Sequence, residues 1–142
     1  MTNKYVFLPH TADAKFQAWG HNMEEAFMNA AYAMADVITD HSKIEPIITK
    51  RIKITSENQE SLLYDFLEHF LFLLDTKRFF LSEIKKIKII AKKNKFLLIA
   101  SVIGDGYHVK YPIKTTIKAV TYQEMFVKHE RNKVTVQVVV DI

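Results

Sequence analysis

The sequence predicts an α+β fold, with two main helices packed on a largely antiparallel or mixed β-sheet in a single domain. Three observations lead to this prediction. The chain has 142 residues, two stretches carry apolar residues at helical spacing, and much of the remainder alternates polar and apolar residues. Both helical stretches lie in the first half of the chain, and strand-like stretches dominate the second half.

The first half begins with two short strands and a helix. Residues 5–8 are apolar, and residues 15–19 alternate as a half-buried strand does. Asn22 can cap a helix, and Glu25 can complete a capping box by bonding back to the cap amide. The buried face of this helix is expected to carry Met23, Ala26, Phe27, Ala30, Ala31, Met34 and Val37.

A strand over residues 50–55 and a second helix follow. The helix is expected to begin near Ser56, with Gln59 in the capping-box position. Burying a Leu or Phe side chain contributes about 1.5–3 kcal/mol, so this helix should anchor the core. Its large apolar residues at helical spacing are Leu62, Leu63, Phe66, Leu67, Phe70, Leu71 and Leu74.

The remainder is rich in strands. Residues 96–103 are so apolar that we expect a central strand buried on both faces. A loop is expected to open at residues 104–106 and to run to about residue 114. The strand-like segments, in order, are residues 84–91, 96–103, 117–122, 125–128 and 134–140.

Composition excludes several classes of site. The chain has no cysteine, which removes disulfides, thiolate zinc sites and a cysteine nucleophile. The net charge is +4, and the lysines lie mostly in alternating segments, which favours a solvated sheet face over a nucleic-acid groove. No apolar run approaches the roughly 18 residues of a membrane span, and no signal peptide precedes the first strand. We therefore expect a cytoplasmic protein without a membrane partner.

Two features could carry chemistry. Residues 10–13, His-Thr-Ala-Asp, stand between two strands, and they form either a turn or a carboxylate held rigidly at a strand end. At the other end of the sequence, Asp141 adjoins the main-chain carboxylate of Ile142. Two crowded carboxylates repel unless a cation neutralises them, and hard divalent cations take such oxygen ligands. The alternative is that Asp141 marks only a strand leaving the core.

In order and spacing, these pieces resemble the archease family over nearly the whole chain, as a single archease-like domain over residues 1–142. The matching segments are residues 10–13 with Phe16, Ala18 and Gly20; residues 24–27 with Ala30 and Ala31; residues 62–67; residues 118–122; and Asp141-Ile142. Archeases assist the RtcB-type tRNA-splicing ligase, which joins RNA ends through a GTP-derived guanylylated histidine.

The resemblance therefore implies an accessory protein rather than an enzyme. Such a protein would promote guanylylation and multiple turnover of the ligase, and would meet tRNA and GTP only through the ligase. An alternative that the family also implies is a chaperone-like modulator of a tRNA-modifying methyltransferase or another RNA-processing enzyme. A third hypothesis, a small metal-dependent hydrolase, would need a second acid–base pair, and the sequence shows none with convincing spacing.

The resemblance also implies site residues. Asp13, Asp141 and the main-chain carboxylate of Ile142 would hold a divalent cation, Ca²⁺ or Mg²⁺/Mn²⁺. His10 would orient Asp13 through a hydrogen bond. Lys118 would contact the ligase, its nucleotide or an RNA phosphate, although a solvent-facing strand lysine is the simpler interpretation.

The chain departs from the family pattern at two places. Gln123 stands where many members have His, which puts any proton transfer at that position in doubt. Gly104-Asp105 stands where Gly-Glu is frequent, and we assign the loop over residues 104–114 no role.

Overall fold

The computed structural model describes residues 4–10, 12–106 and 111–142. The elements formed by these residues are β1 (Tyr5–Leu8), β2 (Asp13–Gly20), α1 (Met23–Ile38), the 3₁₀ helix η1 (His41–Lys43), β3 (Ile48–Ser56), α2 (Gln59–Lys77), β4 (Phe80–Lys92), β5 (Lys95–Asp105), β6 (Ala119–Glu130) and β7 (Lys133–Asp141). The predicted α+β class is confirmed. The strands divide into two antiparallel sheets, of order β1-β2-β7-β6 and β3-β5-β4.

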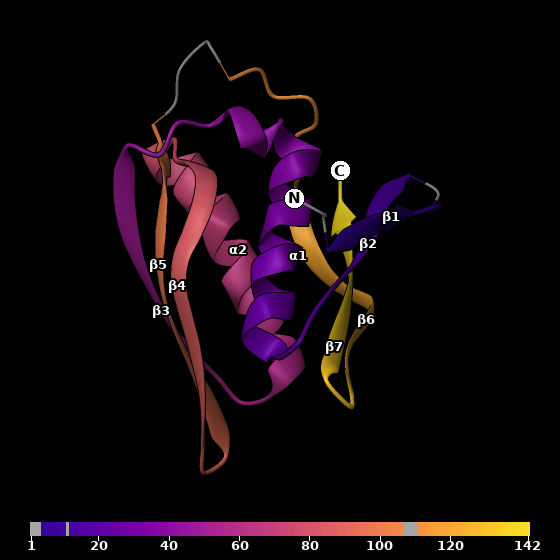
Figure 1. Cartoon of the computed structure of the whole chain (residues 1–142). Helices are drawn as coiled ribbons and strands as arrows, with labels where there is room; N and C mark the ends of the chain where they lie inside the picture. The colour runs from indigo at the N-terminus through magenta and orange to yellow at the C-terminus, as the bar shows by residue number, and fades with distance from the viewer. Residues whose placement is uncertain (1–3, 11, 107–110) are drawn as a thin grey trace.

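The two helices lie between the two sheets, so the molecule has three layers (Figure 1). Both helices contact both sheets: α1 packs on β2, β7 and β4, and α2 packs on β6, β3, β4 and β5. Ala26, Ala30 and Ala33 are fully buried, since the middle layer needs small residues where a helix lies close to its neighbours. The rings of Phe27 and Phe66 stack between the helices with centroids 6.2 Å apart. No helix in the described part of the chain is long and apolar enough to cross a membrane.

The start of α1 follows the expected cap. The Asn22 side chain accepts a hydrogen bond of 2.9 Å from the amide of Glu25. The Glu25 carboxylate, however, accepts from the amide of His21 at 3.1 Å rather than from that of Asn22. The reciprocal half of the box is therefore displaced by one residue toward the N-terminus.

The start of α2 differs from the expectation. The helix begins at Gln59, and Asn58 is its cap, with Ser61 completing the capping box. Ser56 ends β3 instead, and its hydroxyl donates to the Asp65 carboxylate at 2.6 Å. Both Ser56 and Asn58 are cap-forming residue types, so local sequence could not choose between them.

The strands also show where the pattern was misleading. β5 is the central strand of its sheet, as expected, but only one of its faces is buried, and Ile99 on the other face is 36% exposed. Gly104 and Asp105 belong to β5 rather than to the loop that was expected to begin there. A Cβ at Gly104 would lie 1.9 Å from the carbonyl oxygen of Phe80, so β4 and β5 approach too closely there for any side chain.

A half-buried polar cluster ties β1 to the end of α1. Tyr5 donates its hydroxyl hydrogen to Asp36, and the Nδ1 of His41 lies 2.7 Å from the same carboxylate. The ring of Tyr32 stacks on His41 with centroids 5.0 Å apart. Burial raises the pKa of Asp36, but the hydrogen bonds from His41 and Tyr5 outweigh burial and hold that pKa below its ordinary value. The carboxylate therefore stabilises the fold in its charged form.

Candidate functional site

The outer face of the sheet β1-β2-β7-β6 carries the candidate site. Strand alternation turns Phe16 and Ala18 of β2 toward the helices, and it turns Asp13 to the opposite face. Likewise, Val140 of β7 faces inward and Asp141 faces outward. β2 and β7 pair with Asp13 directly opposite Asp141. The structure thus joins two residues that are 128 positions apart in the sequence.

The two opposed carboxylates are suitably spaced to bind a hard cation. Cβ atoms of directly opposite residues on antiparallel strands lie about 4.5–5.5 Å apart, and two carboxylates at that spacing can share one ion whose oxygen ligands lie at about 2.3–2.6 Å. Among the described residues, no group of three or more His, Asp or Glu side chains could hold a metal. Asp13 and Asp141 would therefore need a further oxygen, and the main-chain carboxylate of the neighbouring Ile142 could provide one. Ile142 is 37% exposed, so this end of β7 is open to solvent.

His10 lies beside Asp13, as the resemblance implies. Its Nδ1 is 3.7 Å from Oδ2 of Asp13, which is too long for a hydrogen bond. The same Nδ1 is buried and has no hydrogen-bond partner among the described residues. A buried polar atom that lacks a partner is costly. A small closing movement of Asp13 toward His10 would satisfy it, so the pair is placed for the predicted orienting contact but does not form it. Thr11 of the same motif lies outside the described residues.

Glu124 is a site residue that sequence reasoning missed. β6 joins the two expected segments, residues 117–122 and 125–128, into one strand that begins two residues later, at Ala119, and its register with β7 shifts between Thr121 and Phe126. From Thr121 to Phe126, β6 advances five residues while the paired β7 advances only two, so β6 carries three extra residues in a bulge. Glu124, within this bulge, has a φ of 55°. Its carboxylate lies 3.0 Å from Nζ of Lys15 and 3.2 Å from Nε2 of His10. Hydrogen bonds from Lys15, and then from His10, hold the pKa of Glu124 below its usual range.

Buried amides fix this bulge to the sheet. Gln137 of β7 donates from Nε2 to the main-chain oxygen of Glu124 at 2.8 Å, and it accepts from Gln17 of β2 at 2.8 Å. The only signal in the sequence was the polar pair at residues 123–124 that interrupts an otherwise strand-like stretch. Such a break is typical of a turn as well as of a bulge, so it could not indicate where the carboxylate would lie.

Lys118 meets the site through its backbone. Its amide donates to the carbonyl oxygen of Asp141 at 2.7 Å, immediately before β6 begins with Ala119 opposite Asp141. Lys118 also lines a groove of about 330 Å³ against α2, together with Glu68 and Asp75. Lys118 is exposed, so its side chain is open to solvent where it lines this groove.

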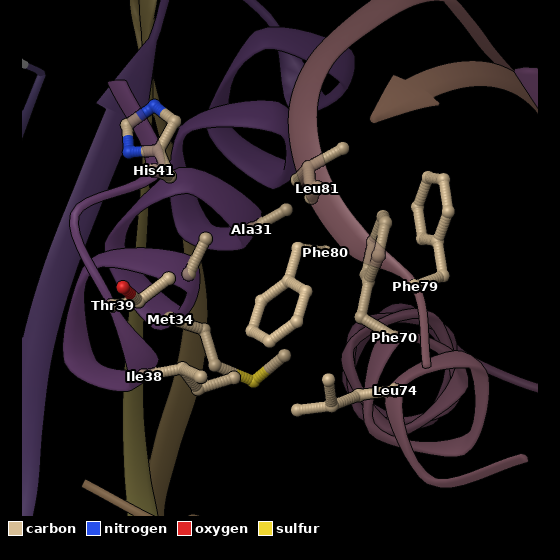
Figure 2. Close-up of a pocket in the computed structure, with 11 residues that line it drawn as sticks. Ala31, Met34, Ile38, Thr39, His41, Phe70, Leu74, Phe79, Phe80 and Leu81 are labelled. Atoms are coloured by element: carbon tan, nitrogen blue, oxygen red, sulfur yellow. The ribbon is translucent and has the colours of Figure 1, made fainter. Parts of the chain in front are cut away.

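A second cavity, shown in Figure 2, lies between α1, α2 and the start of β4. Its walls are mainly apolar, with Met34, Phe70 and Phe80 pointing into it and His41 at one side. The space is about 20 Å³, which is close to the minimum for a single water molecule. This cavity is a packing gap of the helical layer and not a ligand site.

The fold and the site define a class of protein: a small α+β domain of two sheets around two helices, with a half-buried pair of opposed carboxylates at one strand end. Residues 5–142 match the Archease protein family (MTH1598/TM1083). The chain therefore belongs to the archease family.

Relatives support this assignment over most of their length. The chain is 38% identical to Protein archease of Methanothermobacter thermautotrophicus, over 97% of this chain and 98% of the relative. It is 36% identical to Protein archease of Danio rerio, over 100% of this chain and 87% of that relative. The names of these relatives describe no enzymatic reaction, and family membership supports an accessory role.

Solved structures agree with the fold. The solution structure of protein 1598 of Methanobacterium thermoautotrophicum has a TM-score of 0.86 and 37% identity, and the match covers 99% of this chain and 100% of that one. A crystal structure from Thermotoga maritima, described as an archease and possible chaperone, has a TM-score of 0.59 over 95% of this chain and 94% of that one. At 19% identity, this second likeness shows the fold alone.

Proposed function

We propose that the chain is an accessory protein that activates an RtcB-type tRNA-splicing RNA ligase by promoting its GTP-dependent guanylylation and its multiple turnover. The proposal assigns a divalent cation, Ca²⁺ or Mg²⁺/Mn²⁺, to Asp13, Asp141 and the main-chain carboxylate of Ile142. The observation that supports it most is the in-register opposition of Asp13 and Asp141 at an open sheet end. Family membership makes an accessory role the natural setting for that pair.

The residues at the site would have separate roles. Asp13 and Asp141 hold their oxygens on one face of two paired strands, and the amide of Lys118 fixes the main chain at Asp141. The exposed Lys118 side chain, which lines the groove against α2, would contact the ligase, its nucleotide or an RNA phosphate. When bound, the cation would supply positive charge against the charge that develops on the GTP phosphates.

A chaperone-like role for a tRNA-modifying methyltransferase or another RNA-processing enzyme is the second candidate. It is favoured by the groove that Lys118 lines, because two large apolar side chains in that groove are exposed to solvent. Phe72 is 55% exposed and Ile113 is 46% exposed. An apolar client segment could occupy this groove.

The test is guanylylation of the cognate ligase with labelled GTP and a divalent cation, with and without this protein. Wild type should accelerate labelling strongly, and Asp13→Ala should lose most of the acceleration. Glu57→Gln, which removes an exposed acid outside the site, is the matched control and should behave as wild type. If a competent ligase is labelled at the same rate without the protein, the proposal is wrong, and the methyltransferase becomes the partner to test.

A further inference from the structure

The strands of the sheet β3-β5-β4 are strongly basic. These strands and the β4–β5 turn carry nine of the chain's 20 Lys and Arg residues but only two of its 16 acids. This part of the chain thus has a charge of +7, while the rest of the chain has −3, which together give the net charge of +4. The nine cations are Lys50, Arg51, Lys53, Lys85, Lys86, Lys88, Lys92, Lys93 and Lys95.

Strand register arranges four of these cations in a regular pattern. Two successive rows cross the sheet from β3 through β5 to β4: Arg51, Ser101 and Lys86, then Lys53, Ile99 and Lys88. Each row has a cation on both outer strands and a small or apolar residue at the centre. Residues two apart on a strand are about 7 Å apart, and β3 and β4, on either side of β5, are about 10 Å apart. The face therefore carries two parallel columns of positive charge.

A bulge in β4 turns both Lys86 and Lys88 outward. Ile84 pairs with Val102, and Lys86, two residues later, pairs with the residue of β5 adjacent to Val102, Ser101. The extra residue on β4 lets Ile84 face the helices while Lys86, two positions later, faces solvent. Without the bulge, Ile84 and Lys86 would share a face.

These four cations have no acidic partner. Among the described residues, no carboxylate lies within ion-pair distance of Arg51, Lys53, Lys86 or Lys88, and Glu83 on the same face pairs with Lys85. A groove of about 440 Å³ lies on this face, and its lining includes Arg51, Lys86, Lys88, Ile99 and Ser101. The groove therefore offers unpaired positive charge on both sides of a neutral floor.

We propose that this face binds a single-stranded RNA segment through its phosphates. A linear polyanion with evenly spaced charges matches two columns of unpaired cations better than the irregular charges of an acidic protein surface do. No outward-facing residue in the paired rows of these strands is aromatic, so bases have no stacking platform and binding is independent of sequence. The choice of RNA over DNA rests on the proposed function, whereas the choice of a single-stranded polyanion does not. The inference departs from our expectation that RNA is met only through the ligase.

The test measures fluorescence anisotropy of a labelled, unstructured 20-nucleotide RNA with the full chain, at several salt concentrations and without ligase. Each phosphate neutralised on a single strand contributes about −0.7 to the slope of log K against log salt, so four contacts predict a slope of about −2.8. The double variant Lys86→Gln/Lys88→Gln should halve that slope. If wild type and this variant bind RNA equally at 1 M salt, the variant should bind about 25-fold more weakly than wild type at 0.1 M salt. The charge-matched control Lys43→Gln/Lys77→Gln replaces exposed lysines elsewhere and should bind as wild type.

Three results would overturn the inference: no RNA binding by wild type, equal loss in the control variant, or poly-glutamate competing as well as RNA. Equal binding of single-stranded DNA would overturn the choice of RNA alone. Asp13→Ala separates this inference from the proposed function, because that variant should lose ligase activation but keep RNA binding. Retained activation together with failed RNA binding would reject the RNA surface and leave the ligase role standing.

Discussion

The opposed carboxylates predict a specific response to metal. In the metal-free protein, Asp13 and Asp141 face each other as like charges, and such a cross-strand pair destabilises a sheet by about 0.2–1 kcal/mol. Asp13→Asn removes this repulsion but also removes a ligand. The variant should therefore be slightly more stable than wild type without metal and less stable than wild type with metal.

The magnitude follows from mass action. A cation at 100 times its Kd stabilises the folded protein by about 2.7 kcal/mol. At roughly 2.1 cal/mol/K per residue, 142 residues give an unfolding entropy of about 300 cal/mol/K, so each kcal/mol moves Tm by about 3 °C. Saturating metal should raise the Tm of wild type by about 9 °C. Asp13→Asn should gain about 1–3 °C without metal and should show almost no gain with it.

The assay is thermal unfolding by circular dichroism in EGTA and in millimolar Ca²⁺, Mg²⁺ or Mn²⁺ at constant ionic strength. Glu57→Gln removes an exposed acid elsewhere and should keep the full metal response of wild type. An Asp13→Asn variant with an undiminished metal response would refute the ligand assignment. A metal-free Asp13→Asn that is less stable than wild type would refute the view that the pair is repulsive.

Three further predictions concern other parts of the molecule. Lys118→Ala should lower ligase activation in the guanylylation assay. Its Tm should change by no more than about a degree, because the side chain is exposed and only the backbone of Lys118 bonds to Asp141. An unchanged guanylylation rate would remove Lys118 from the partner surface. Gly104→Ala should lower the free energy of unfolding by at least about 1–3 kcal/mol, measured by urea unfolding, because its Cβ would collide with the carbonyl oxygen of Phe80. An unchanged free energy of unfolding would contradict that close approach of β4 and β5. The depressed pKa of Asp36 contributes stability that is present above the ordinary value of 3.8 and is lost as pH falls through the folded-state value. Asp36→Asn should therefore be less stable than wild type at pH 7, and the difference should shrink as pH falls below 3.8. A difference that stays constant with pH would contradict the cause given.

Helical periodicity made both helices predictable because seven or so apolar residues in each share one face. The division into two sheets was not predictable, since alternation tells which face of a strand is buried and not which strand it pairs with. β5 shows the limit most clearly. Its run of apolar residues suggested burial on both faces, but Ile99 and its outward neighbours face solvent between two columns of basic residues.

For the site, the resemblance supplied Asp13 and Asp141, and the register of β2 and β7 then brought the two together. Their role as metal ligands stays a prediction. Glu124 could not be foreseen, because its place over Lys15 and His10 depends on a bulge held by Gln137 from another strand. A contact of this kind depends on tertiary pairing, and the local sequence carries only a break in the strand pattern.

The most direct test of the central claim is the number of ligated RNA molecules formed per ligase molecule, with GTP and a divalent cation present. With wild-type protein this number should rise well above one, and with Asp13→Asn it should stay near the value of the ligase alone. A ligase that turns over equally well without the protein, or with Asp13→Asn in its place, would contradict the account.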